Sequence, residues 1–100
     1  MELLYTPKAA TQLKDIGSYI SGELQNPSVA RSIQNKIMTD CESLIVFPEM
    51  GREVCLADDG RIVRLLVSGN YVVIYDVQGD NVIVVSVEDA RTNWIALLLE

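Results

Sequence analysis

The sequence contains no histidine, and this absence excludes several kinds of chemistry. Without an imidazole, neither a Ser-His-Asp triad nor a Cys-His pair can form, and the ordinary neutral-pH base is missing. The two cysteines, Cys41 and Cys55, lack C-x-x-C spacing and have no histidine to complete a zinc site. We therefore expect two reduced thiols, with neither metal nor cofactor.

Long apolar runs and positive charge are also scarce. No run approaches the roughly 18 residues that a membrane-spanning helix needs, and the N-terminal MELLYTPK does not resemble a signal peptide. We therefore expect a cytoplasmic protein with no membrane partner. The chain has 8 Lys and Arg residues and 14 Asp and Glu residues, which gives a net charge of −6. Proteins that bind nucleic acid usually carry a basic excess, so the charge balance disfavours this class of partner.

The chain has 100 residues, 49% of them hydrophobic, which is enough for one domain spanning residues 1–100. Residues 2–5 form a short candidate strand. Thr6-Pro7 then combines a helix N-cap with a proline at the first helical position. Apolar residues follow at three- and four-residue steps and predict one buried helix face: Ala9, Leu13, Ile16, Ile20 and Leu24.

Asn26-Pro27 repeats this pattern and predicts a second amphipathic helix. Its apolar face comprises Ala30, Ile33, Ile37, Cys41 and Leu44. Because the connection is so short, the two helices should form an antiparallel hairpin over residues 7–46. Phe47-Pro48 and Gly51 end it, and we expect a loop carrying Asp58-Asp59-Gly60 to lead into a sheet.

Three apolar segments then alternate with the turns Ser68-Gly69-Asn70 and Gln78-Gly79-Asp80, which predicts an antiparallel meander. On the middle strand, Tyr71, Val73, Tyr75 and Val77 should share one face, and Val72, Ile74 and Asp76 the other. The fold class is therefore α+β, a two-helix hairpin packed on a small, mainly antiparallel sheet. Since the hairpin covers one apolar face, we expect the C-terminal tail or another polypeptide to cover the second.

In this order the residues resemble the RelE/ParE superfamily of toxins from bacterial type II toxin–antitoxin systems. The matching positions are Tyr5-Thr6-Pro7-Lys8-Ala9, Leu13, Ile16, Tyr19-Ile20, Asn26-Pro27, Ala30, Leu44, Phe47-Pro48, Gly51, Arg64-Leu65, residues 69–75, Arg91, Trp94 and Leu97-Leu98. The resemblance implies a toxin that is held inactive by a cognate antitoxin lying over its hydrophobic surface.

The resemblance leaves two activities open. ParE-like members inhibit DNA gyrase and are not enzymes, whereas RelE-like members are ribosome-dependent endoribonucleases that cleave mRNA. The hairpin with Tyr19-Ile20 and Asn26-Pro27 is more similar to the ParE branch. Where many members carry a His-Gly-Arg-Arg-Asp-like run, this chain has residues 89–93, DARTN, which lack the histidine and the second arginine. We expect a gyrase inhibitor; the alternatives are a ribonuclease and an inactive toxin-fold protein.

Several residues are candidates for function. If the chain is a ribonuclease, Arg64 and Arg91 would steady the phosphate, with Tyr71 or Tyr75 assisting. Predicted partner contacts are Arg61, Arg91, Trp94, Leu97 and Leu98. Arg61 and Arg64 stand three apart on one strand, so they should point to opposite faces. If Arg64 has a structural role, we expect it to pair with Glu88 or Asp89.

Overall fold

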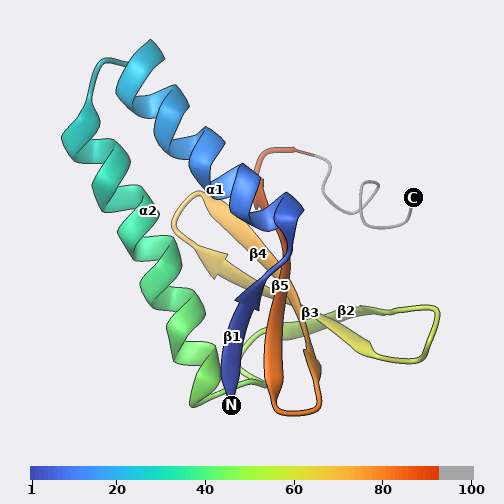
Figure 1. Ribbon diagram of the computed structural model, residues 1–100. Coiled ribbons are helices and arrows are strands. Elements are labelled where there is room, and N and C mark those ends of the chain that lie inside the picture. The colour runs from blue at the N-terminus through green and yellow to red at the C-terminus, as the bar shows by residue number, and fades with distance from the viewer. Residues whose placement is uncertain (93–100) are drawn as a thin grey trace.

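Two capped helices open the fold, and the structure, a computed structural model, describes residues 1–92 of the chain (Figure 1). Helix α1 (Pro7–Ser18) starts where predicted, because the Thr6 hydroxyl accepts a hydrogen bond from the Ala9 amide at 3.1 Å. Helix α2 (Pro27–Glu42) starts in the same way, with Asn26 accepting from Val29 at 3.2 Å. These caps satisfy amide groups that the first helical turn leaves without partners.

The two helices form the predicted antiparallel hairpin, and its tip projects beyond the sheet (Figure 1). The π-helical turn η1 (Tyr19–Glu23) extends α1 toward the tip. Midway along the hairpin, the Gln34 side chain donates a hydrogen bond to the Leu13 carbonyl at 3.0 Å. Gly17 lies directly against the end of the Gln34 side chain, so a larger residue there would displace that side chain from the Leu13 carbonyl.

Within residues 1–92 the sheet has five strands in the order β1-β5-β4-β3-β2. Strand β1 runs parallel to β5, and the other neighbours are antiparallel, so the mainly antiparallel prediction is confirmed. The strands are β1 (Glu2–Tyr5), β2 (Arg52–Leu56), β3 (Ile62–Ser68), β4 (Tyr71–Gln78) and β5 (Asn81–Asp89). A single 3-10 turn, η2 (Ser43–Ile45), follows α2. The predicted loop carrying Asp58-Asp59-Gly60 does lead into β3, but the sequence analysis missed edge strand β2, which comes before that loop.

Alternate residues of β4 point to opposite faces of the sheet, as the sequence pattern predicted. On the helix-covered face, Val73, Val84 and Val87 pack with Ala9, Ile37 and Cys41. Tyr75 lies on the same face, against Leu44 and Val82. The opposite face holds a second cluster in which no side chain is more than 7% exposed: Val63, Leu65, Val72 and Ile74.

The large apolar side chains with the highest exposed fractions lie outside this second cluster. They include Val46 and Phe47 after α2, Leu56 at the end of β2 and Val67 near the end of β3. The C-terminal tail or another polypeptide was expected to cover the second sheet face; residues 93–100 lie outside the described part of the chain, so this stays a prediction. In residues 1–92, no helix is long and apolar enough to span a bilayer.

Candidate functional site

Tyr75, a candidate for assisting RNA cleavage, is completely buried. Its hydroxyl donates a hydrogen bond to the Pro48 carbonyl at 2.8 Å and accepts one from the Gly51 amide at 2.9 Å. Burial raises the pKa of this phenol above its ordinary value. The hydroxyl therefore fastens the turn between α2 and β2 and does not face solvent.

Arg64 forms hydrogen bonds to the same turn between α2 and β2. Its guanidinium donates to the Gly51 carbonyl at 2.9 Å and to the Glu49 carbonyl at 3.4 Å, and it contacts the Glu53 carboxylate at 3.4 Å. The predicted pairing with Glu88 or Asp89 was wrong. Those residues belong to β5, which is separated from β3 by β4, whereas the turn lies directly against β3.

Arg61 points to the opposite sheet face, as predicted. It forms ion pairs with Asp59 at 2.6 Å and with the buried carboxylate of Asp76 at 2.7 Å. Asp76 also accepts a hydrogen bond from the Gln78 side chain at 3.0 Å. Because a buried carboxylate needs a charged or hydrogen-bonding partner, Arg61 has a structural task in addition to its predicted role as a partner contact.

The other end of β4 is more open. There Tyr71 is half-buried, with its pKa raised by burial, and borders a hollow of about 290 Å³. The hollow is lined by Gln12, Asp15, Ile16, Tyr19, Tyr71, Val87, Glu88 and Asp89. The Gln12 side chain joins α1 to β5 here, donating to the Glu88 carboxylate at 2.7 and 2.9 Å and accepting from the Val87 amide at 2.8 Å.

Arg91 lies beside this hollow, and its side chain is 88% exposed. It donates two hydrogen bonds to the Asp89 carboxylate, at 2.8 and 3.0 Å. Hydrogen bonds from Arg91 lower the pKa of Asp89 to about 2. The guanidinium keeps a large solvent-facing surface, so Arg91 is available to a partner.

The four candidate ribonuclease residues do not come together. Arg64 stands opposite Tyr75 on the β3–β4 ladder, whereas Asp89, two residues before Arg91, stands opposite Tyr71. Tyr71 and Tyr75 are four residues apart on one strand, which corresponds to about 13 Å at about 3.3 Å per residue. Arg64 and Tyr75 therefore occupy one end of β4, and Tyr71 and Arg91 the other.

In the described part of the chain, no group of three or more Cys, Asp and Glu side chains is placed to hold a metal ion. Trp94, Leu97 and Leu98, the predicted partner contacts of the C-terminal tail, lie outside the described residues.

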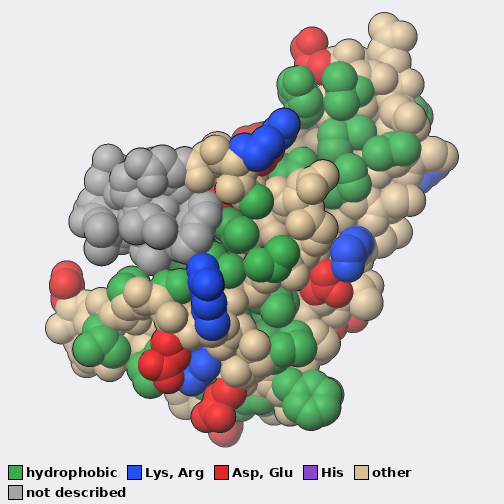
Figure 2. All heavy atoms as spheres, turned by 180° about the vertical axis from the view of Figure 1, so that it is seen from behind, with side chains coloured by type: hydrophobic (Ala, Val, Ile, Leu, Met, Phe, Trp, Pro, Cys, Tyr) green, Lys and Arg blue, Asp and Glu red, His purple; other side chains and the backbone are tan. Residues whose placement is uncertain are grey.

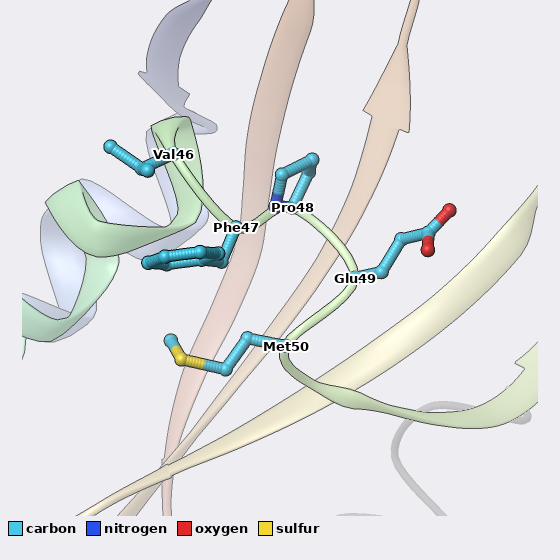
Figure 3. A pocket seen from close by; sticks show the side chains of 5 residues that line it. All are labelled: Val46, Phe47, Pro48, Glu49 and Met50. Atoms are coloured by element: carbon cyan, nitrogen blue, oxygen red, sulfur yellow. The ribbon is translucent and has the colours of Figure 1, made fainter.

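Sequence reasoning missed the turn after α2 as a surface. Val46, Phe47, Pro48, Glu49 and Met50 line a hollow of about 460 Å³ (Figure 3). The signal was present as three consecutive apolar residues, Ile45 to Phe47, directly before Pro48. We interpreted this segment only as the end of the hairpin.

From behind, hydrophobic side chains follow the helical hairpin, with charged side chains between them (Figure 2).

Comparisons with known proteins identify a family and a matching fold. A family model described as "ParE toxin of type II toxin-antitoxin system, parDE" matches residues 3–94. A solved structure titled "Chromosomal ParDE TA system from P. aeruginosa" aligns with a TM-score of 0.74 and 22% sequence identity, covering 89% of this chain and 95% of that one. At this identity the likeness shows the fold, and no curated protein matches the sequence. Because the family model spans nearly the whole chain, this protein belongs to the ParE toxin family of type II toxin–antitoxin systems.

Proposed function

We propose that this toxin inhibits DNA gyrase by binding to it, without being an enzyme, and that a cognate antitoxin neutralises it. The observation that carries the proposal is the match of the ParE toxin model to residues 3–94. That match includes both ends of β4 and the segment with Arg91, so it is not limited to a shared helical hairpin.

The arrangement of charged and phenolic groups supports binding over RNA cleavage. A ribonuclease needs cations and a proton-transferring group around one phosphate. Here Arg64 and the Tyr75 hydroxyl are bonded to the turn after α2. Arg91 lies at the other end of β4, and the sequence has no histidine to assist it. Arg91 is therefore the candidate contact to the target, acting through charge and hydrogen bonding.

Two parallel assays test this function. The purified chain is titrated into plasmid supercoiling by purified gyrase and, separately, into translating ribosomes, where mRNA cleavage is followed. We expect inhibition of supercoiling and intact mRNA. Cleavage of mRNA with unaffected gyrase would overturn the proposal in favour of a ribonuclease. If neither assay responds, the chain is an inactive toxin-fold protein.

A further inference from the structure

Strand β5 contains a bulge that changes which face its side chains occupy. Val84 and Val87 both pack with Val73 on the helix-covered face, although residues three apart on a regular strand point to opposite faces. The pairing of β5 with β4 shifts by one residue between them and leaves Val85 without a partner on β4. Such a bulge turns every side chain after it to the other face of the sheet.

The bulge determines where the end of β5 points. Asp89 stands opposite Tyr71 and borders the hollow on the helix side of the sheet. In a strand without the extra residue, the alternation would turn Asp89 to the opposite face. Asp89 also holds Arg91, accepting hydrogen bonds from the Arg91 amide at 2.8 Å and from its guanidinium at 2.8 and 3.0 Å. Arg91 therefore lies beside the hollow because β5 is bulged before it.

Two side chains from the N-terminal part of the chain hold the bulged segment. Strand β1 pairs with β5 only as far as Val84, so within residues 1–92 the edge of β5 beyond that point has no neighbouring strand (Figure 1). There the Thr6 hydroxyl donates a hydrogen bond to the Val85 carbonyl at 2.8 Å. Two residues further along, the Gln12 side-chain oxygen accepts one from the Val87 amide at 2.8 Å. These side chains satisfy backbone groups that a neighbouring strand would otherwise satisfy.

The Gln12 side chain is itself oriented by Glu88. Its amide nitrogen donates to both carboxylate oxygens of Glu88, at 2.7 and 2.9 Å, which leaves its oxygen facing the Val87 amide. The reverse orientation would set an oxygen against the carboxylate and a nitrogen against another N–H donor, so neither bond would form. Because the carboxylate is charged, these bonds are stronger than those between neutral groups. Gln12 therefore ties α1 to β5 in one defined geometry.

From this geometry we infer that Gln12 is a positioning residue for Arg91. By holding β5 against α1 directly after the bulge, it fixes the face of the sheet on which Arg91 meets the target, and its effect on binding acts through Arg91. The inference rests on the proposed function only for the identity of that target. The placement of Arg91 is a property of the toxin alone and is measured separately.

Gln34 provides a matched control for the test. Like Gln12, it is a half-buried glutamine on a helix, and its side chain bonds to a backbone group, the Leu13 carbonyl at 3.0 Å. That bond lies within the helical hairpin and does not involve β5. Gln12→Met and Gln34→Met each replace the amide with an apolar side chain of similar length, so both lose a backbone hydrogen bond and only the first frees β5.

A double-mutant cycle in the gyrase supercoiling assay tests the effect on binding. Gln12→Met should weaken inhibition by about 3- to 10-fold and Gln34→Met by less than about 2-fold. In an Arg91→Ala background, Gln12→Met should add less than about 2-fold, because the residue through which it acts is gone. Effects that multiply in the double variant, or an equal loss in Gln34→Met, would show a general structural role and overturn the inference.

An exchange of donor and acceptor separates the lost bridge from general damage to the fold. Gln12→Glu alone places two carboxylates against each other and should weaken inhibition. Adding Glu88→Gln supplies an amide donor opposite the new carboxylate, which still accepts from the Val87 amide. The double variant should therefore inhibit gyrase to within about 2-fold of the wild type. Failure of this rescue, with both variants folded by circular dichroism, would contradict the role of the bridge.

NMR measures the placement of β5 without gyrase. In Gln12→Met, hydrogen exchange at the Val87 amide should accelerate by about 5- to 10-fold, and the Overhauser contacts between Tyr71 and Asp89 should weaken. Both should stay at wild-type values in Gln34→Met. Unchanged exchange and contacts in Gln12→Met would overturn the inference, as would a change in both that leaves gyrase inhibition intact. A wild-type toxin that leaves gyrase active would contradict the proposed target, and these NMR readouts would then decide the inference by themselves.

Discussion

The two ends of strand β4 carry the same types of residue and use them differently. At one end Tyr75 is buried, and its hydroxyl and the neighbouring Arg64 are bonded to the turn after α2. At the other end Tyr71 is half-buried, and the neighbouring Arg91 is almost entirely exposed beside a hollow. A tyrosine and an arginine are therefore structural at the Tyr75 end and accessible at the Tyr71 end.

This difference shows that residue type alone does not identify a functional residue in this fold. An arginine whose donors are bonded to backbone carbonyls shapes the surface above it, as Arg64 shapes the turn. An arginine that is itself exposed and paired only with one neighbouring carboxylate, as Arg91 is with Asp89, can exchange that partner for another. Four predictions test this contrast.

The largest expected effect separates the two tyrosines. Tyr75→Ala should lower the free energy of unfolding by about 3–5 kcal/mol, because it leaves a cavity against Leu44 and Val82 and frees the turn. Tyr71→Ala should cost about 1–2 kcal/mol, because part of its ring is already in solvent. Urea denaturation measures both variants. Equal losses would show that the two ends do not differ as described.

Gly51→Ala should destabilise the Tyr75 end without removing any bond. A Cβ at this position would lie 2.7 Å from the Tyr75 ring and 2.8 Å from the Leu65 carbonyl oxygen. The crowding should cost about 1–3 kcal/mol in urea denaturation. Gly60→Ala is no suitable control because of its positive φ, whereas Gly22→Ala, with nothing near its Cβ, is. Wild-type stability in Gly51→Ala would contradict the tight contact.

The two arginines should separate stability from binding. Arg64→Ala should cost about 1–2 kcal/mol, since it leaves the Gly51 carbonyl without its charged donor. Arg91→Ala should leave the free energy of unfolding close to that of the wild type, because its side chain is almost entirely in solvent. In the supercoiling assay the Arg91 variant should nevertheless inhibit gyrase about tenfold less well. Wild-type stability in Arg64→Ala would contradict the structural role of Arg64. Full inhibition of gyrase by Arg91→Ala would contradict the role of Arg91 in binding the target.

The smallest effect concerns the Asp89–Arg91 pair. In the native protein the Asp89 carboxyl should titrate with a pKa of about 2, and in Arg91→Ala the value should return to about 3.9. Because the folded-state pKa is lowered, the pair stabilises the fold above about pH 4 and loses its contribution as the pH falls toward 2. NMR titration of the carboxyl group checks this. A wild-type pKa near 4 would show that the pair does not persist in solution.

Much of the fold was predictable from local signals. Thr6-Pro7 and Asn26-Pro27 indicated both helix starts because capping and proline preferences act within one turn. The alternation from Tyr71 to Val77 assigned both faces of β4. Strand β2 was missed because it is short, starts with the charged pair Arg52-Glu53 and contains a bulge before Cys55. These features remove the regular alternation that identifies a strand.

The site was less predictable because its decisive contacts are made to backbone atoms. Arg64 and Tyr75 bond to carbonyl and amide groups of residues 48–51, and every residue offers such groups, so sequence gives no sign of the partner. Carboxylates are visible in a sequence, and for that reason we assigned Glu88 or Asp89 to Arg64. The pairing failed because β4 lies between the strands that carry them.

The proposed function depends most directly on one measurement, the supercoiling of relaxed plasmid by purified gyrase with increasing toxin, repeated after adding the product of the adjacent reading frame. We predict inhibition by the toxin alone and recovery of supercoiling once that partner is bound. Undiminished supercoiling at saturating toxin, together with cleavage of mRNA on translating ribosomes, would contradict it.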